Sequence, residues 1–308
     1  MSNQEVIEDF LVDCRTQGMQ ESTIDIYRLK MTIIDRFYDK NLKELDNGDL
    51  KELLNYLQDE RGIGNTTIAH YFKILSSFFN YLEYKELVDR NILPNFRRRY
   101  LKQRMKNQDT NVDSKRQIIS VEQMRNLVNS IIDPRDRAIM VLLAKTGVRV
   151  SELGRIEMGD IDFHKRTITL KKNGKRSNLK VLFDVETENV LRRWINARNT
   201  MNYDGNALFI SYDMGERKPL SICGIRDAVT KYARRLGIHK DRGRLEERFT
   251  PHCARHWFTT FLRKSGMPRE YIKYLRGDSL NETMDIYNHI DFEELKESYD
   301  RCIPKLLV

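Results

Sequence analysis

Features of secreted, membrane-bound and disordered proteins are scarce in this chain of 308 residues. Its four cysteines show no paired spacing, which argues against a disulfide framework and favours reduced, mostly buried thiols. No apolar run reaches the roughly 18 residues of a membrane-spanning helix. The opening segment MSNQEVIEDF lacks the basic and apolar blocks of a signal peptide, so we expect a cytoplasmic protein that does not contact a membrane.

Positive charge is what the chain has in excess. Its 54 Lys and Arg outnumber 45 Asp and Glu, and the net charge of +9 favours a polyanionic partner. A solvated charged face would explain either of its two basic stretches alone, residues 97–106 or 234–248, but the pair favours DNA. The basic residues of the first stretch, which are the predicted DNA-binding residues, are Arg97, Arg98, Arg99, Lys102, Arg104 and Lys106.

Four amphipathic segments predict a helical bundle over residues 1–95. Each repeats apolar side chains at intervals of three and four residues, the period of a helix that buries one face. Ser22 or Thr23 is placed to cap the second helix. The four apolar faces consist of Val6, Ile7, Phe10 and Leu11; Ile26, Leu29, Ile33 and Phe37; Leu50, Leu53, Leu54 and Leu57; and Ile68, Tyr71, Phe72, Leu75, Phe78, Phe79 and Leu82.

A segment without helical periodicity separates the two halves of the chain. Apolar spacing stops near Pro94 and basic and polar residues follow, so we place an interdomain linker at residues 96–117. A second, mostly helical domain over residues 118–308 then starts with Ser120 and Gln123, which form a capping box.

The second domain combines helices with one clear β signal. Asp133-Pro134 opens a helix that Gly147 is placed to end. Residues 167–170 and 179–182 have the pattern of strands around Asn173-Gly174, the preferred pair for a tight type I′ turn. The predicted fold is therefore mainly α with a small β-hairpin or sheet, in two domains.

Four separated segments of the second domain carry residues suited to phosphate chemistry. They are Thr146-Gly147-Val148-Arg149-Val150-Ser151-Glu152-Leu153, Lys171-Lys172-Asn173-Gly174-Lys175, Thr250-Pro251-His252-Cys253-Ala254-Arg255-His256, and Tyr274-Leu275-Arg276-Gly277-Asp278 with Ile286-Tyr287-Asn288-His289. In this order they resemble the catalytic signature of tyrosine recombinases, the family of phage integrases and Xer-type enzymes. The stretch from Leu275 to Asp278 resembles archaeal members more than bacterial ones.

The resemblance implies catalytic roles for Arg149, His252, Arg255, Tyr287 and a lysine of the hairpin. Matching the turn selects Lys172 for this role, with the neighbouring Lys171 and Lys175 as alternatives. Glu152, one helical turn after Arg149, matches the acidic residue that supports such sites. The implied reaction is site-specific recombination, in which duplex DNA is cleaved and rejoined through a 3′-phosphotyrosine. The resemblance further implies that four protomers exchange strands on two DNA sites through a Holliday junction, and that residues 1–95 form a SAM-like domain that binds core DNA.

The chemistry explains why these residue types are needed. Breaking a phosphodiester without a metal requires fixed cations for the charge that develops on its oxygens, and a guanidinium matches two phosphate oxygens. A tyrosine with a pKa of about 10 needs help to lose its proton, for which His252 is suited. Lys172 would protonate the departing 5′ oxygen. The covalent link conserves the bond energy, and the chain has no Walker-type loop, so we expect neither a metal nor a nucleotide cofactor.

One position departs from the family pattern. The residue after Gly277 is Asp278, where the family usually has histidine or tryptophan. An ionised carboxylate cannot donate a hydrogen bond to a phosphate and repels it. Either Asp278 points away and Arg276 or another donor substitutes, or the site works with one donor fewer.

The sequence leaves several alternatives open. A DNA clamp without chemistry, a DNA-binding regulator, is one, and a type IB topoisomerase-like nicking and relaxing enzyme is another. His252, Cys253 and His256 are a weak candidate for a metal cluster. The C-terminal segment 292–308, with a helical apolar spacing, is predicted to dock either onto a neighbouring protomer or onto its own domain.

Overall fold

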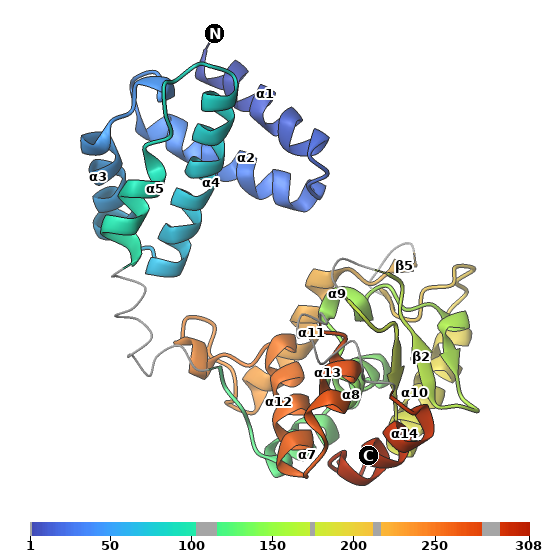
Figure 1. The fold of residues 1–308 in the computed structure, drawn as a ribbon. Helices are drawn as coiled ribbons and strands as arrows, with labels where there is room; N and C mark the ends of the chain where they lie inside the picture. Colours follow the sequence, from blue (N-terminus) through green and yellow to red (C-terminus); the bar gives the residue numbers. More distant parts are fainter. Residues whose placement is uncertain (1, 103–115, 173–175, 212–216, 279–289) are drawn as a thin grey trace. The chain divides into compact units, whose positions relative to one another are not determined.

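The computed structural model describes residues 2–102, 116–172, 176–211, 217–278 and 290–308 (Figure 1). The chain divides into two compact units, an N-terminal unit, Met1–Ser114, and a C-terminal unit, Lys115–Val308. Each has its own hydrophobic core. Within the described residues, no helix combines the length and the apolar character needed to span a bilayer.

The N-terminal unit is helical throughout its described residues. Its elements are α1 (Asn3–Thr16), α2 (Glu21–Phe37), the 3₁₀-helix η1 (Leu42–Glu44), α3 (Asn47–Asn55), the π-helix η2 (Tyr56–Glu60), α4 (Asn65–Tyr84), α5 (Leu93–Phe96) and the π-helix η3 (Arg97–Leu101). Capping boxes start α1 at Ser2 and α3 at Asp46, where side chains satisfy backbone N–H groups that have no partner within the helix. The apolar faces predicted for α1, α3 with η2, and α4 are all buried.

The prediction of which face of α2 is buried was wrong. Ile26 and Leu29 are 44% and 63% exposed, and the helix begins at Glu21 without a side-chain cap from Ser22 or Thr23. The sequence offers two apolar stripes with helical spacing, and packing on α1 and α4 selects the other one. The buried stripe consists of Ile24, Tyr27, Met31 and Ile34.

Helical structure continues past residue 96, where we expected the linker to begin. Phe96 and Leu101 are buried, and the ring of Phe96 stacks on that of Phe72 with centroids 5.2 Å apart. The first part of the basic stretch therefore packs on the N-terminal bundle. The sequence did not indicate this packing, because three arginines lie between Phe96 and Leu101.

The C-terminal unit is built around α8, which is buried on most sides. Its helices are α7 (Val121–Asn129), α8 (Pro134–Thr146), α9 (Val150–Leu153), α10 (Val185–Asn199), α11 (Ile222–Arg235), α12 (Pro251–Lys264), α13 (Arg269–Arg276) and α14 (Phe292–Cys302), with the 3₁₀-helices η5 (Met158–Asp160) and η6 (Leu245–Glu247). Helices α7, α10, α11 and α12 pack against α8 (Figure 1). The fold is mainly helical with small sheets, as the sequence predicted.

Two small sheets complete the C-terminal unit. The antiparallel order β1-β2-β3 joins β1 (Ile161–Asp162), β2 (Thr167–Thr169) and β3 (Lys180–Leu182), and β4 (Ile210–Ser211) pairs with β5 (Lys218–Pro219). The two predicted strands are present as β2 and β3. Their last backbone hydrogen bond joins Leu170 to Leu179, and the predicted turn at Asn173-Gly174 lies outside the described residues. Strands β1, β4 and β5 were not predicted, because a strand of two residues is too short to show the alternation of apolar and polar side chains.

The C-terminal segment packs on its own unit. Leu295, Tyr299, Ile303 and Leu306 are buried, whereas Leu307 is exposed. The hydroxyl of Tyr299 donates to the carbonyl of Lys145 at 2.8 Å. Of the two alternatives for residues 292–308, the structure thus has the segment packed against the unit that carries it.

Candidate active site

Arg149 is placed by the sharp turn that ends α8. Gly147 adopts a left-handed conformation with φ of 61°, and a Cβ there would lie 2.4 Å from Cδ1 of Phe258, so the turn requires glycine. Arg149 then becomes the N-cap of α9. Glu152 accepts from the backbone N of Arg149 at 2.7 Å and from its Nη1 at 3.0 Å. The side chain of Arg149 stays 43% exposed and available to a ligand.

Arg255 is the buried member of the predicted arginine pair. It projects from α12, is 4% exposed, and donates from Nη1 to the carbonyl of Gly147 and from Nη2 to that of Arg276. Burial, with Arg149 and Arg276 nearby, lowers the pKa of Arg255 to about 10. The group is therefore still charged at neutral pH, and its geometry is fixed by the ends of α8 and α13.

Asp278 faces the arginines rather than pointing away. Its Oδ1 lies 3.1 Å from Nη2 of Arg255 and 3.8 Å from Nη2 of Arg149, and its Oδ2 lies 3.0 Å from Nε of Arg276. Of the two alternatives for Asp278, the one in which its side chain points away from the site was therefore wrong. Three guanidinium groups attract the carboxylate more strongly than water solvates it at this half-buried position.

Arg176 is a buried member of the site that the sequence analysis missed. It follows the hairpin tip and is 6% exposed. Its guanidinium donates to Oε2 of Glu152 at 3.0 Å and to the carbonyls of Leu275 and Arg276, each at 2.9 Å. These carbonyls lie at the C-terminal end of α13, where they have no partner within the helix. Nothing in the local sequence distinguishes Arg176 from the basic residues beside it.

Lys171 and Lys172 of the hairpin make no hydrogen bond or ion pair with the described residues of the arginine cluster, and Lys175 lies outside the described residues. Lys172 is exposed and makes no hydrogen bond or ion pair with another described residue, whereas Lys171 pairs with Glu157. The base of the hairpin is nevertheless attached to α13, because the backbone N of Ser177 donates to Gly277 and its hydroxyl donates to the carbonyl of Asp278.

His252 lies on α12, one turn before His256, and their rings meet edge to face with centroids 4.8 Å apart. Partial burial and the positive charges of Arg116, Arg255 and Arg276 lower the pKa of His252 to about 4. At neutral pH the imidazole is therefore neutral and able to accept a proton. No third His, Cys, Asp or Glu joins the two rings as a metal-binding group within the described residues.

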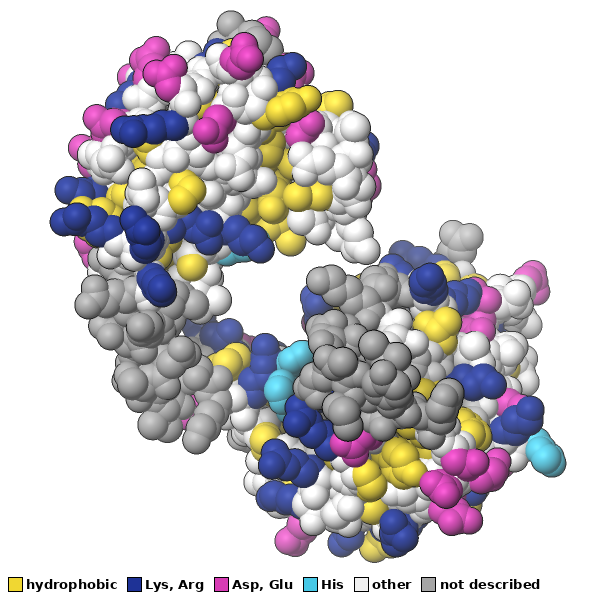
Figure 2. All heavy atoms as spheres, viewed as in Figure 1, with side chains coloured by type: hydrophobic (Ala, Val, Ile, Leu, Met, Phe, Trp, Pro, Cys, Tyr) yellow, Lys and Arg dark blue, Asp and Glu magenta, His cyan; other side chains and the backbone are white. Residues whose placement is uncertain are grey.

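The remaining predicted residues divide between the two units and the undescribed segments. Tyr287, Arg104 and Lys106 lie outside the described residues. Arg97, Arg98 and Arg99 form most of η3 and Lys102 follows it; Figure 2 shows Lys and Arg side chains along one edge of the N-terminal unit. The second basic stretch is partly neutralised, because Arg234 pairs with Asp241 and Lys240 with Glu247.

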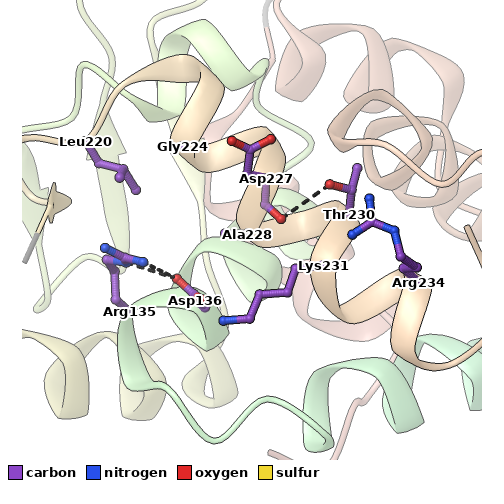
Figure 3. A pocket seen from close by; sticks show the side chains of 9 residues that line it. All are labelled: Arg135, Asp136, Leu220, Gly224, Asp227, Ala228, Thr230, Lys231 and Arg234. Atoms are coloured by element: carbon purple, nitrogen blue, oxygen red, sulfur yellow. Dashed lines mark hydrogen bonds and ion pairs between the residues drawn. The ribbon is translucent and has the colours of Figure 1, made fainter. Parts of the chain in front are cut away.

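Two pockets of the C-terminal unit differ in their relation to this cluster. One, of about 620 Å³, lies between α12 and α13 and is lined by Arg276, Asp278 and the basic residues Arg263, Arg269 and Lys273. The other, of about 360 Å³, lies between α8 and α11 and contains none of the predicted catalytic residues (Figure 3). Its mixed charges include the adjacent pair Arg135 and Asp136.

Comparison with known proteins agrees with this geometry. The phage integrase family model matches residues 103–294, and the model of the phage integrase N-terminal SAM-like domain matches residues 6–89. Tyrosine recombinase XerC of Haemophilus ducreyi is 29% identical over 80% of this chain and 75% of its own length. Tyrosine recombinase XerC of Pelotomaculum thermopropionicum is 26% identical, with 85% and 82% covered.

Solved structures show the same fold. The Tn1549 transposon integrase in complex with circular intermediate DNA has a TM-score of 0.66 at 22% identity, covering 95% of this chain and 98% of its own. A lambda integrase dimer bound to a COC′ core site has a TM-score of 0.69 at 16% identity, covering 95% and 99%. The chain belongs to the phage integrase family. It is a tyrosine site-specific recombinase with a SAM-like N-terminal domain, as the motifs predicted.

Proposed function

We propose that this recombinase uses Arg149 and Arg255 to bind the scissile phosphate of duplex DNA and Tyr287 to attack it. The observation that carries the proposal is the convergence of both guanidinium groups on one carboxylate oxygen of Asp278. A site that already holds one anionic oxygen between two forked donors is suited to a phosphate oxygen. Glu152, which also accepts from Arg176, orients Arg149, and the carbonyls of Gly147 and Arg276 orient Arg255.

The remaining roles follow from charge and position. Neutral His252 accepts the proton that the Tyr287 phenol loses, and Lys172, on the exposed hairpin, protonates the 5′ oxygen as it leaves. The resulting 3′-phosphotyrosine keeps the energy of the phosphodiester, so religation reverses the same steps. The reaction proceeds without a metal or a nucleotide cofactor.

The proposed substrate is duplex DNA bound by both units. The relatives of known structure include integrases solved with DNA, and the basic residues of η3 suit contact with the phosphate backbone. The proposed domains are residues 1–95 and 118–308; of the basic segment 96–117 between them, residues 96–101 pack on the N-terminal bundle. Four protomers assembled on two DNA sites exchange strands through a Holliday junction, and the reaction takes place in the cytoplasm.

Covalent trapping tests the roles of the named residues. The protein is incubated with a library of random duplexes that carry a nick, so that cleavage releases a short strand and cannot be reversed. Protein-linked DNA is recovered after denaturation and sequenced. We expect an adduct with the intact protein and none with Tyr287→Phe.

The other outcomes separate the alternatives. DNA binding without an adduct would support the regulator and overturn the catalytic roles. An adduct that persists in Tyr287→Phe would overturn the choice of nucleophile. With the recovered site in hand, relaxation of supercoils without exchange between two sites would support a topoisomerase-like reaction instead.

A further inference from the structure

Asp278 lies in a cluster of opposite charges. Among the described residues, the guanidinium groups of Arg149, Arg176, Arg255 and Arg276 meet two carboxylates here. Glu152 is almost fully buried, and both its oxygens are engaged by Arg149 and Arg176. Of the two described carboxylates, Asp278 is therefore the one whose contacts a ligand is able to replace.

The side chain of Asp278 has no other structural task among the described residues. Its carboxylate contacts only the three arginines, while its backbone N donates to Lys273 and its carbonyl accepts from Ser177. The side chain is 30% exposed and lines the pocket of about 620 Å³ between α12 and α13. The carboxylate thus has space to turn away without loss of the backbone bonds that hold its segment.

We propose that Asp278 is an internal competitor for phosphate, which occupies the arginine cluster in the free protein and leaves it when a phosphodiester binds. A carboxylate and a phosphate oxygen require the same forked donors, so both cannot have them at once. Asp278 thereby lowers the affinity of the arginine cluster for any single phosphate. DNA must make enough contacts with the rest of the protein to displace the Asp278 carboxylate. A full DNA site is therefore favoured over an isolated contact with the phosphate backbone.

Phosphate binding by the full chain tests this directly. The inference rests on the proposed role of the cluster in phosphate binding, but not on Tyr287 or on a known DNA site. Inorganic phosphate is titrated into the protein and its affinity is measured by calorimetry, with thermal stabilisation as a second readout. We expect Asp278→Asn, which keeps the shape and removes the charge, to bind phosphate about tenfold or more tightly than the natural protein.

Two further variants make the result specific. Glu270→Gln removes an exposed carboxylate from the first turn of α13, changes net charge equally and should leave phosphate affinity near that of the natural protein. Asp278→Asn combined with Arg149→Gln should lose the gain. Equal affinity in Asp278→Asn and the natural protein, or a gain that survives the loss of Arg149, would overturn the proposal. Failure of covalent trapping would leave this result unchanged, so the two hypotheses are separable.

Discussion

The side chain of Arg176 lies so close beneath Gly277 that a Cβ on that glycine would be 2.5 Å from Cγ of Arg176. Gly277 also has a φ of 62°, which ends α13 and turns the chain towards Asp278. Gly277 of the closing motif therefore has a physical role. Because Gly277 has no side chain, Arg176 passes beneath the end of α13 and donates to the free carbonyls of that helix.

Replacing this glycine should disturb both fold and site. We expect Gly277→Ala to lower the free energy of unfolding by about 1–3 kcal/mol, because the new methyl group meets Arg176 and the residue is strained at positive φ. Urea unfolding measures the change. Gly159→Ala is the matched control, since nothing lies within 4 Å of a Cβ there and its φ is not positive. Equal losses in the two variants would contradict the close packing.

A buried ion cluster ties the C-terminal tail to α8. Nζ of Lys145, with no exposed surface, lies 2.7 Å from Asp184 and 2.6 Å from Glu186, and it donates to the carbonyl of Pro304. Glu186 also accepts from the backbone N of Leu306 at 2.9 Å. Removal of the lysine would leave two carboxylates close together, with the exposed Lys305, 3.7 Å from Asp184, as their remaining partner among the described cations.

Lys145→Ala should therefore be strongly destabilising, by about 3–5 kcal/mol in denaturant unfolding. The matched control is Lys240→Ala, which breaks an exposed pair with Glu247 and should cost at most about 1 kcal/mol. Deletion of residues 304–308 should destabilise in the same direction, because Leu306 is fully buried. A truncated protein with unchanged stability would show that the tail does not hold this position in solution.

Substitutions of Arg149 and Arg255, the two proposed catalytic arginines, should differ in their combined effects on rate and stability. Arg149→Ala should slow adduct formation about 10²–10³-fold, the usual effect of losing one donor to a developing oxyanion. Its half-exposed side chain should leave unfolding nearly unchanged. Arg255→Ala should slow adduct formation and also cost about 3 kcal/mol of stability, because two buried carbonyls lose a charged donor. An Arg149 variant as unstable as the Arg255 variant would contradict this difference.

The parts of the fold that local sequence encodes were predictable. The capping box of Ser120 and Gln123 starts α7, and Asp133-Pro134 and Gly147 delimit α8, as expected from residues only a few positions apart. The family motifs likewise gave Arg149 and Arg255, which the fold brings onto one carboxylate. In each case the signal and the structure it specifies lie in the same short segment.

What the sequence could not reveal depends on contacts between distant residues. Arg176 bonds to carbonyls about one hundred positions away, and no local pattern marks a buried arginine within a basic stretch. The orientation of Asp278 depends on three guanidinium groups from α9, α12 and α13. The face of α2 was misjudged for the same reason, since only its neighbours choose between two apolar stripes.

The histidines of α12 should make stability depend on pH in a particular window. Burial and nearby cations lower the pKa of His252 to about 4 and lower that of His256, whereas the unfolded value is about 6.5. Between these limits the unfolded chain binds more protons than the folded one, so stability falls as pH decreases from about 6.5 towards 4.

The free energy of unfolding, measured at pH 7.5, 6.5 and 5.5, would check this prediction. Carboxylates lose their charge below that range and therefore contribute little to the change in stability within it. The double variant His252→Gln and His256→Gln should lose less stability between pH 7.5 and 5.5 than the natural protein does. The matched control is His164→Gln, an exposed position in the turn between β1 and β2. If the double variant and the natural protein lose stability equally over this range, burial and the nearby cations do not lower the pKa values of these imidazoles.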